Sequence, residues 1–482
     1  AEVKYVHQNV GFDAIDAASG KFNITNRFYF TNLKKYQIHY SVLANGKTVK
    51  SGKVSLDIAP QASKEFTVPV NGLKARPGTE YFVNFSVIAV EPEPLIPAGY
   101  EIAYDQFRLP VEAERNTYKA NGPALQTQTQ GDELTVSSSK VNFVFNKKSG
   151  LVTSYKVDGT EYFKDGFGIQ PNFWRAPNDN DYGNGAPKRL HVWKQSSKDF
   201  HVTDTKVSTE DKAVLLQATY LLAAGNLYVV TYKIYPSGIV HVNAKFTSTD
   251  MQAAETEVSE ATRMATFTPG SDAARKAASK LEVPRIGVRF RLPAQMNNVQ
   301  YFGRGPEENY IDRNHGTMVG IYQTTADKMY FNYVRPQENG HHTDTRWLNL
   351  SPDKGNGLVI VADSLIGFNA LRNSVEDFDS EEALPHPYQW NNFSPEEAAN
   401  HDEKAARNVL RRMHHVNDVT PRDFVEVCVD MKQQGVGGYD SWGARPEPFH
   451  QIPANREYNW GFTLVPVRSG SQATEAAKYD YR

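Results

Sequence analysis

Cysteine is almost absent from this sequence, since Cys428 is the only one among 482 residues. A single thiol excludes an internal disulfide framework and fits a reducing compartment. Cys428 lies in the alternating apolar run 423–430. We therefore predict that it occupies a buried strand position and is not a nucleophile.

An excess of charge of one sign is also missing. The net charge is −2, from 53 Lys and Arg against 55 Asp and Glu. No apolar run approaches the length of a membrane span, and no signal peptide precedes the first strands. We expect neither nucleic acid nor a membrane as a partner. The chain begins at Ala1 without an initiator methionine, which is compatible with the loss of an upstream segment.

Aromatic and turn-forming residues are abundant: 25 Tyr, 25 Phe, 33 Gly and 26 Pro. This profile is typical of a β-rich protein with many turns. In the first part of the chain Asn45 and Gly46 predict a tight hairpin turn. About seven short strands in roughly 110 residues predict an immunoglobulin-like β-sandwich over residues 1–110. The clearest segments are 21–30, 36–43, 47–56, 63–70, 80–90 and 101–109.

Residues 111–131 are rich in Gln, Thr, Glu, Ala and Asn, and we predict an extended linker there. Residues 132–482 again read as strands, with helices predicted only at 273–281 and from the capping box at Ser394 to about Met413. Strands without intervening helices favour large antiparallel sheets over βαβ units. The predicted fold class is therefore all-β. The clearest strands in this part are 227–235, 238–246, 286–292 and 357–362.

A glycine-rich loop at 435–446 presents a single tryptophan, Trp442. Glycines let the backbone turn tightly while the indole stands away from it, and such an arrangement suits the apolar face of a sugar ring. The alternative is a buried hydrophobic plug. Asp440 and Arg445 are polar groups of the kind that orient sugar hydroxyls.

Two other segments are rich in charged and amide side chains. The segment 173–183 could bind Ca²⁺, but its spacing does not match an EF-hand loop, and we favour a hydrogen-bonded loop. The segment 301–313 lacks the spacing of a phosphate-binding loop. Its charged side chains predict a paired network, which is more often structural than catalytic: Arg304, Glu307, Glu308, Asp312 and Arg313.

The segment 336–347 contains the adjacent pair His341 and His342. Neighbouring side chains on a strand point to opposite faces, so we do not expect both to ligate one metal ion. A histidine acting with a glutamate as an acid–base pair remains open.

The motifs RAP-x-DND (175–181), YFG-x-GP-x-ENY-x-DR (301–313), ENG-x5-R (338–346) and GG-x-DSW (437–442) occur in this order. Together they resemble the C-terminal part of the large bacterial β-galactosidases of glycoside hydrolase family 2. The resemblance covers about 130–467, and 1–110 is similar to the preceding immunoglobulin-like domain mainly by strand pattern. It implies that 132–482 is a β-supersandwich related to galactose mutarotases.

The resemblance also implies what lies elsewhere. Both catalytic glutamates of the retaining reaction belong to a (β/α)₈ barrel, so no catalytic residue and no metal ligand is expected on this chain. Any Mg²⁺ or Na⁺ requirement belongs to that barrel. Trp442, Asp440 and Ser441 match the substrate-binding loop, with Trp442 stacking on the sugar and the other two shaping the loop. The motif does not extend to Arg445.

The expected partners are a galactoside, the barrel-bearing domains or large subunit, and further copies in a homo-oligomer. The bacterial compartment, cytoplasm or periplasm, stays open. Two alternatives remain. One is an aldose 1-epimerase-like enzyme, for which His341 or His342 with Glu307 or Glu338 are the candidate acid and base. The other is a free-standing carbohydrate-binding module.

Overall fold

The computed structural model describes residues 2–248, 282–379, 415–468 and 472–482. Strands dominate it, and the predicted all-β fold class is confirmed. The helices predicted at 273–281 and 394–413 lie outside the described residues. In the described part of the chain no helix is long and apolar enough to cross a membrane.

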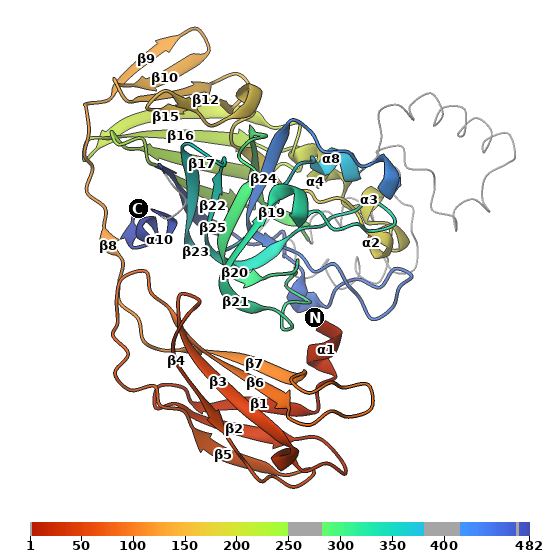
Figure 1. Ribbon diagram of the computed structural model, residues 1–482. Coiled ribbons are helices and arrows are strands. Elements are labelled where there is room, and N and C mark those ends of the chain that lie inside the picture. Colours follow the sequence, from red (N-terminus) through yellow and green to blue (C-terminus); the bar gives the residue numbers. More distant parts are fainter. Residues whose placement is uncertain (1, 249–281, 380–414, 469–471) are drawn as a thin grey trace, which may run out of the picture.

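The N-terminal part is a sandwich of two antiparallel sheets around an aromatic core (Figure 1). Phe85 stacks on Phe12 at 4.8 Å between ring centroids and meets Phe22 edge-on at 5.0 Å. Asn45 and Gly46 both have positive φ, as the predicted hairpin requires. One sheet has β1 (Val10–Asp16), β2 (Lys21–Asn26) and β5 (Ser63–Thr67); the other has β4 (Lys47–Val54), β3 (Tyr36–Ala44), β6 (Tyr81–Ala89) and β7 (Glu101–Leu109).

The stretch predicted as a linker contains two short strands. β8 (Asn116–Thr117) pairs in parallel with β26 (Tyr479–Asp480), and β9 (Gln126–Gln130) forms one edge of a five-stranded sheet. Every residue of β9 is exposed, so its sequence carries no alternating apolar pattern. The rest of that sheet is β10 (Glu133–Ser137), β11 (Val141–Asn146), β12 (Leu151–Val157) and β13 (Thr160–Glu161).

A twelve-stranded antiparallel sheet forms the body of the C-terminal part. Its path runs β14 (Gln170–Asn172), β19 (Arg285–Pro293), β24 (Phe424–Gln433), β23 (Gly357–Leu371), β25 (Tyr458–Val467), β18 (Val240–Thr247), β17 (Leu227–Ile234), β16 (Ala213–Leu221) and β15 (His201–Glu210). Off this path, β20 (Asn298–Gly305) pairs with β21 (Met318–Thr325) and β22 (His342–Ser351).

The helices within the described residues are short and lie beside the sheets (Figure 1). They are α1 (Glu2–Val6), α2 (Asp179–Gly183), α3 (Ala186–Arg189), α4 (His191–Ser196), α7 (Ala326–Met329), α8 (Val375–Phe378) and α10 (Ala473–Ala476).

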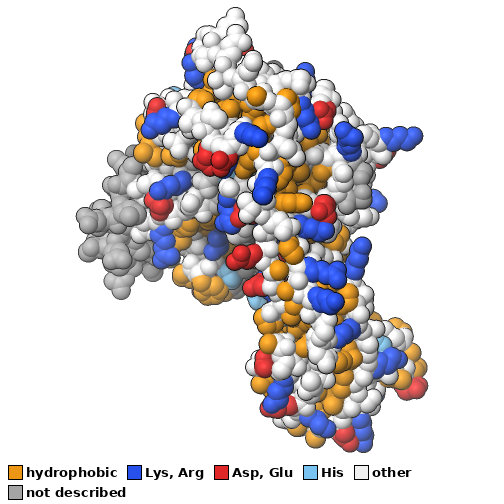
Figure 2. Space-filling view, turned by 90° about the vertical axis from the view of Figure 1, so that its left-hand side faces the viewer, with side chains coloured by type: hydrophobic (Ala, Val, Ile, Leu, Met, Phe, Trp, Pro, Cys, Tyr) orange, Lys and Arg blue, Asp and Glu red, His pale blue; other side chains and the backbone are white. Residues whose placement is uncertain are grey.

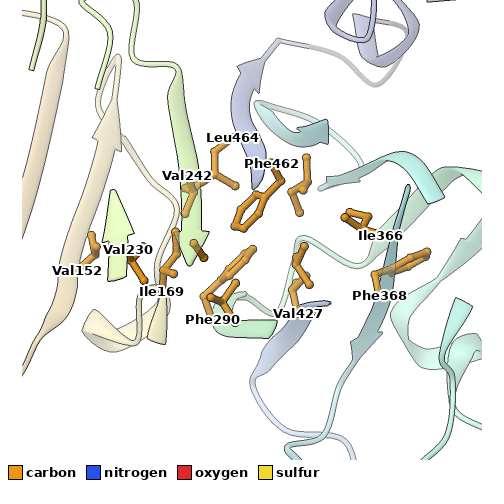
Figure 3. Close-up of a cluster of buried hydrophobic side chains, with 14 of the residues drawn as sticks. Val152, Ile169, Val230, Val242, Phe290, Ile366, Phe368, Val427, Phe462 and Leu464 are labelled. Carbon is orange, nitrogen blue, oxygen red and sulfur yellow. The ribbon is translucent and has the colours of Figure 1, made fainter. Parts of the chain in front are cut away.

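One continuous apolar core fills the C-terminal part (Figure 3). Phe290 of β19, Val427 of β24 and Phe462 of β25 are fully buried in it. Cys428 is buried on β24, as predicted, and burial raises the pKa of its thiol. Alternation along each strand gives the inward face to these apolar side chains.

The two parts meet through both apolar and ionic contacts, at the narrow waist that Figure 2 shows. Phe82 of β6 joins a buried cluster with Val319 and Trp347 from the larger part. Arg346 donates from Nε and Nη2 to the carboxylate of Glu80 at 2.9 and 2.8 Å. A bidentate pair of this kind fixes orientation as well as proximity.

Candidate functional site

The loop 435–446, here called the Trp442 loop, follows β24. The side chain of Trp442 is 75% exposed, so it is not a buried plug. Tyr439 and Phe449 are exposed as well. Three large aromatic side chains are thus exposed between residues 439 and 449.

Asp440 shapes the tip of this loop. Its Oδ1 accepts hydrogen bonds from the backbone N–H groups of Trp442, Gly443 and Ala444 at 3.0, 3.2 and 2.9 Å. These bonds, first the one from Ala444, lower the pKa of the carboxyl. Ser441 is exposed beside Trp442. The tip is therefore a turn closed by its own carboxylate.

The segment 173–183 lies against the Trp442 loop. Its side chains are hydrogen-bonded, as predicted, but its last five residues form the helix α2 and not a loop. Asn178 caps α2 with a capping box, and Arg175 forms a buried ion pair with Asp181 at 2.8 Å. The Nδ2 of Asn178 donates to Val436 O at 2.6 Å, and the Nδ2 of Asn180 donates to Asp440 O at 2.9 Å. Within the described residues no group of three or more His, Cys, Asp or Glu could hold a metal ion.

The segment 301–313 contacts the loop from another side. Asp312 accepts a hydrogen bond from the backbone N–H of Gly437 at 2.7 Å. The predicted charge network is right for Glu308 and Arg313, which pair at 2.6 Å. It is wrong for Arg304, which pairs with an aspartate outside the segment, Asp344, at 2.6 Å. The sequence could not show this partner, because β20 and β22 become neighbours only in the sheet.

The segment 336–347 contributes to a buried cluster, here called the polar centre: Arg285, Glu338, His341, Asn369, Asp430 and Gln433. The guanidinium of Arg285 donates to Glu338 and to Asn369, each at 3.0 Å, and to Gln433. Its Nε lies 3.3 Å from Asp430 Oδ2. His341 Nδ1 lies 3.0 Å from Asn369 Oδ1. All six side chains are closed off from solvent.

Burial dominates the protonation of this centre. Burial and, after it, the charge of Arg285 together lower the pKa of His341 to about 3. Burial raises the pKa of Asp430 to about 7, against the opposing effect of Arg285. The adjoining cavity, bordered by Arg285 and Glu338, has a volume of about 20 Å³. Such a space holds one water and no sugar ring.

The histidines therefore do not match the proposed acid–base role. His342 is also buried, with its Nδ1 3.1 Å from Gly340 O and a pKa lowered by burial. Its ring lies against Tyr301 and Phe368, whereas that of His341 stacks on Tyr310. The two rings have different surroundings, as opposite faces predict, and among the described residues neither ring lines the cavity beside the polar centre.

Arg445 is held by an ion pair with the body of the chain. Its Nη2 pairs with Glu282, a buried carboxylate, at 2.8 Å. Glu282 also pairs with Arg189 of α3. Although burial acts to raise the pKa of Glu282, the two guanidiniums lower it overall. Arg445 thus anchors the end of the Trp442 loop to the body of the chain.

Two motif regions thus bond directly to the fourth, and the third lies near it. Residues 175–181 and 312 bond directly to the Trp442 loop, and Glu338 lies in the polar centre with Gln433, near its start. Sequence reasoning singled out Trp442 and Asp440 but missed Asn178 and Asn180. The density of amide side chains at 178–180 was a signal for backbone contacts, yet it could not indicate which backbone.

Two family models match the chain: "Beta galactosidase small chain" over residues 137–464 and "Beta-galactosidase, domain 4" over residues 22–110. The chain belongs to the β-galactosidase small-chain family.

Two relatives of the chain are named β-galactosidase. The chain is 32% identical over 470 residues to a β-galactosidase of Priestia megaterium, which covers 97% of this chain and 39% of the relative. A β-galactosidase of Streptococcus thermophilus is 25% identical, over 96% of this chain and 39% of its own length. This small-chain family member therefore spans well under half the length of these relatives.

One of the similar solved structures is galactose 1-epimerase from Lactobacillus acidophilus NCFM. It has a TM-score of 0.35 at 8% identity and covers 73% of this chain and 100% of its own. At this level of similarity we infer nothing about the chain from that structure.

Proposed function

We propose that this chain forms the C-terminal part of a β-galactosidase, an enzyme that releases terminal β-D-galactose from galactosides. Two catalytic glutamates on a (β/α)₈ barrel outside this chain would carry out retaining hydrolysis. The chain itself would have no turnover. Its contribution would be Trp442, which offers an indole face to the sugar at the mouth of the barrel, together with contacts between domains and subunits.

The observation that carries the proposal is the contrast within one loop. Trp442 is 75% exposed, while the backbone around it is held by Asp440, Asn180 and Asp312. A side chain that is exposed yet fixed at its base suits stacking, because little conformational freedom is lost on binding. An aromatic contact of this kind contributes about 0.5–1.5 kcal/mol beyond area burial.

Replacement of Trp442 by alanine in the complete enzyme tests the role. We expect the KM for a galactoside to rise about 2- to 13-fold, the range that such a stacking energy gives. Phe449→Ala is the matched control, because Phe449 is an exposed aromatic just after the loop and outside the motif. Unchanged kinetics in Trp442→Ala, with normal folding, would show that the indole does not bind the sugar.

The isolated chain distinguishes the proposal from its rivals. We expect it to show no galactoside hydrolysis, and calorimetry with galactosides should detect little binding without the barrel. Tight binding by the chain alone would favour a carbohydrate-binding module. Rapid mutarotation of freshly dissolved galactose, followed by polarimetry, would favour an epimerase in spite of the closed polar centre.

A further inference from the structure

We propose that Asn180 is a positioning residue for Trp442, which it orients by closing the Trp442 loop against α2. This inference rests on the sugar-stacking role of Trp442 proposed above. The Nδ2 of Asn180 donates to the carbonyl of Asp440 at 2.9 Å and to that of Ala444 at 3.3 Å. One carboxamide therefore ties together the two ends of the turn that carries the indole.

The support behind Asn180 is rigid. Asn178 caps α2 through a capping box, and the buried pair of Arg175 and Asp181 fixes the same segment from below. Asn178 also bonds to Val436 O at 2.6 Å, near the start of the loop. A group held in this way keeps its own orientation, so it can impose one on the loop.

The backbones of the two segments also touch. A Cβ placed on Gly183 would clash with the carbonyl of Trp442 and would lie 2.8 Å from Cα of Gly443. Gly443 has φ of +143°, a conformation that side chains rarely adopt. The loop can pack this closely on α2 only because both positions are glycine.

Asn180 and Asp440 have different tasks. The carboxylate of Asp440 accepts hydrogen bonds from residues 442–444 of the loop itself, and so defines the shape of the turn. Asn180 bonds from outside and defines where the turn lies relative to the body of the chain. Loss of Asn180 should leave the turn intact but free to tilt, which changes the direction of the indole without unfolding the protein.

The contact depends on the amide hydrogens. Both acceptors are backbone carbonyls, so the carboxylate of Asn180→Asp has the right shape but nothing to donate. It also adds a charge between Asp179 and Asp181. In the complete β-galactosidase we expect this variant to raise the KM for a galactoside about 2- to 10-fold, with kcat little changed.

The decisive measurement is a double-mutant cycle with Trp442→Ala. If Asn180 acts through the indole, Asn180→Asp has no further effect on KM once Trp442 is alanine. Hydrogen exchange of residues 439–444 provides a readout without turnover, and it should become faster in Asn180→Asp at an unchanged Tm. Asn356→Asp is the matched control, since Asn356 donates from Nδ2 to a side chain outside the Trp442 loop, the hydroxyl of Thr160, at 2.9 Å.

The outcomes separate the two proposals. A raised KM in Trp442→Ala with an unaltered KM in Asn180→Asp would overturn the positioning role alone. An effect of Asn180→Asp that persists in the Trp442→Ala background would also overturn it. Unchanged kinetics in Trp442→Ala would instead remove the proposed function. If Asn180→Asp does not fold, Gly183→Ala tests the same contact from the facing backbone, with the same expected rise in KM and the same cycle.

Discussion

The polar centre and the Trp442 loop are adjacent in the chain, but their side chains differ in exposure to solvent. Arg285 and Asp430 are charged-type side chains with no exposure, whereas Trp442 is a large apolar side chain that is 75% exposed. Gln433, the last residue of β24, is buried, yet the loop that exposes Trp442 begins only two residues later. Charged side chains are usually exposed and large apolar side chains are usually buried, and each region shows the opposite.

The reversal has a different physical meaning in each region. Buried charges cost desolvation energy, so they persist only where partners compensate, and the centre acts as a fixed internal support. An exposed indole costs little in folding but remains available for contact. The shifted pKa values of His341 and Asp430 follow first from burial, so they do not by themselves mark a substrate site at the polar centre.

The largest expected effect comes from breaking the polar centre. Arg285→Met should lower the free energy of unfolding by about 3–5 kcal/mol, because Glu338 and Asp430 would stay buried without their guanidinium. Chemical denaturation measures it. The control Lys245→Met removes one member of an exposed pair with Glu457 and should cost at most about 1 kcal/mol. Equal effects of the two substitutions would contradict a supporting role for the centre.

A second prediction concerns pH. The folded-state pKa of Asp430, raised from 3.8 to about 7, means that the folded chain binds more protons there, so stability falls as pH rises through about 4 to 7. His341, lowered from 6.5 to about 3, has the opposite effect between about pH 3 and 6.5. The two contributions largely cancel in the native protein.

Asp430→Asn should remove the contribution of Asp430 to the pH dependence of stability and leave that of His341. The stability of the variant should then rise more steeply than that of the native chain between pH 4 and 6.5, by up to about 1.4 kcal/mol per pH unit. Denaturation midpoints at pH 4.5 and 6.5 measure the difference. Parallel curves for the two proteins would show that Asp430 is already ionised when buried.

The smallest effect on global stability is expected in the loop. Asp440→Ala removes three hydrogen bonds to the backbone of residues 442–444 on an exposed turn. Amide exchange at these residues should become roughly tenfold faster, while the denaturation midpoint stays where it was. A matched drop in the midpoint would mean that the loop and the polar centre unfold as one unit, which would weaken the contrast between them.

Much of the fold follows from short-range pattern. Alternation in 81–89 predicted β6, and every second side chain there, from Tyr81 to Ala89, is buried. The same reasoning missed β1, whose last four residues are exposed, and β9, which is exposed throughout. Edge segments of this kind owe their conformation to ladder hydrogen bonds with a neighbour, and their side chains carry little trace of it.

The sequence by itself determined the all-β class, the buried strand position of Cys428 and the glycine-rich loop that presents Trp442. Only the tertiary structure decided that Trp442 is exposed, that Arg445 is committed to Glu282, and that Asn180 reaches the loop from a segment some 260 positions away. Propensity and periodicity act over a few residues. The partner of a buried charge or a free amide depends on which strands become neighbours, and no local pattern encodes that.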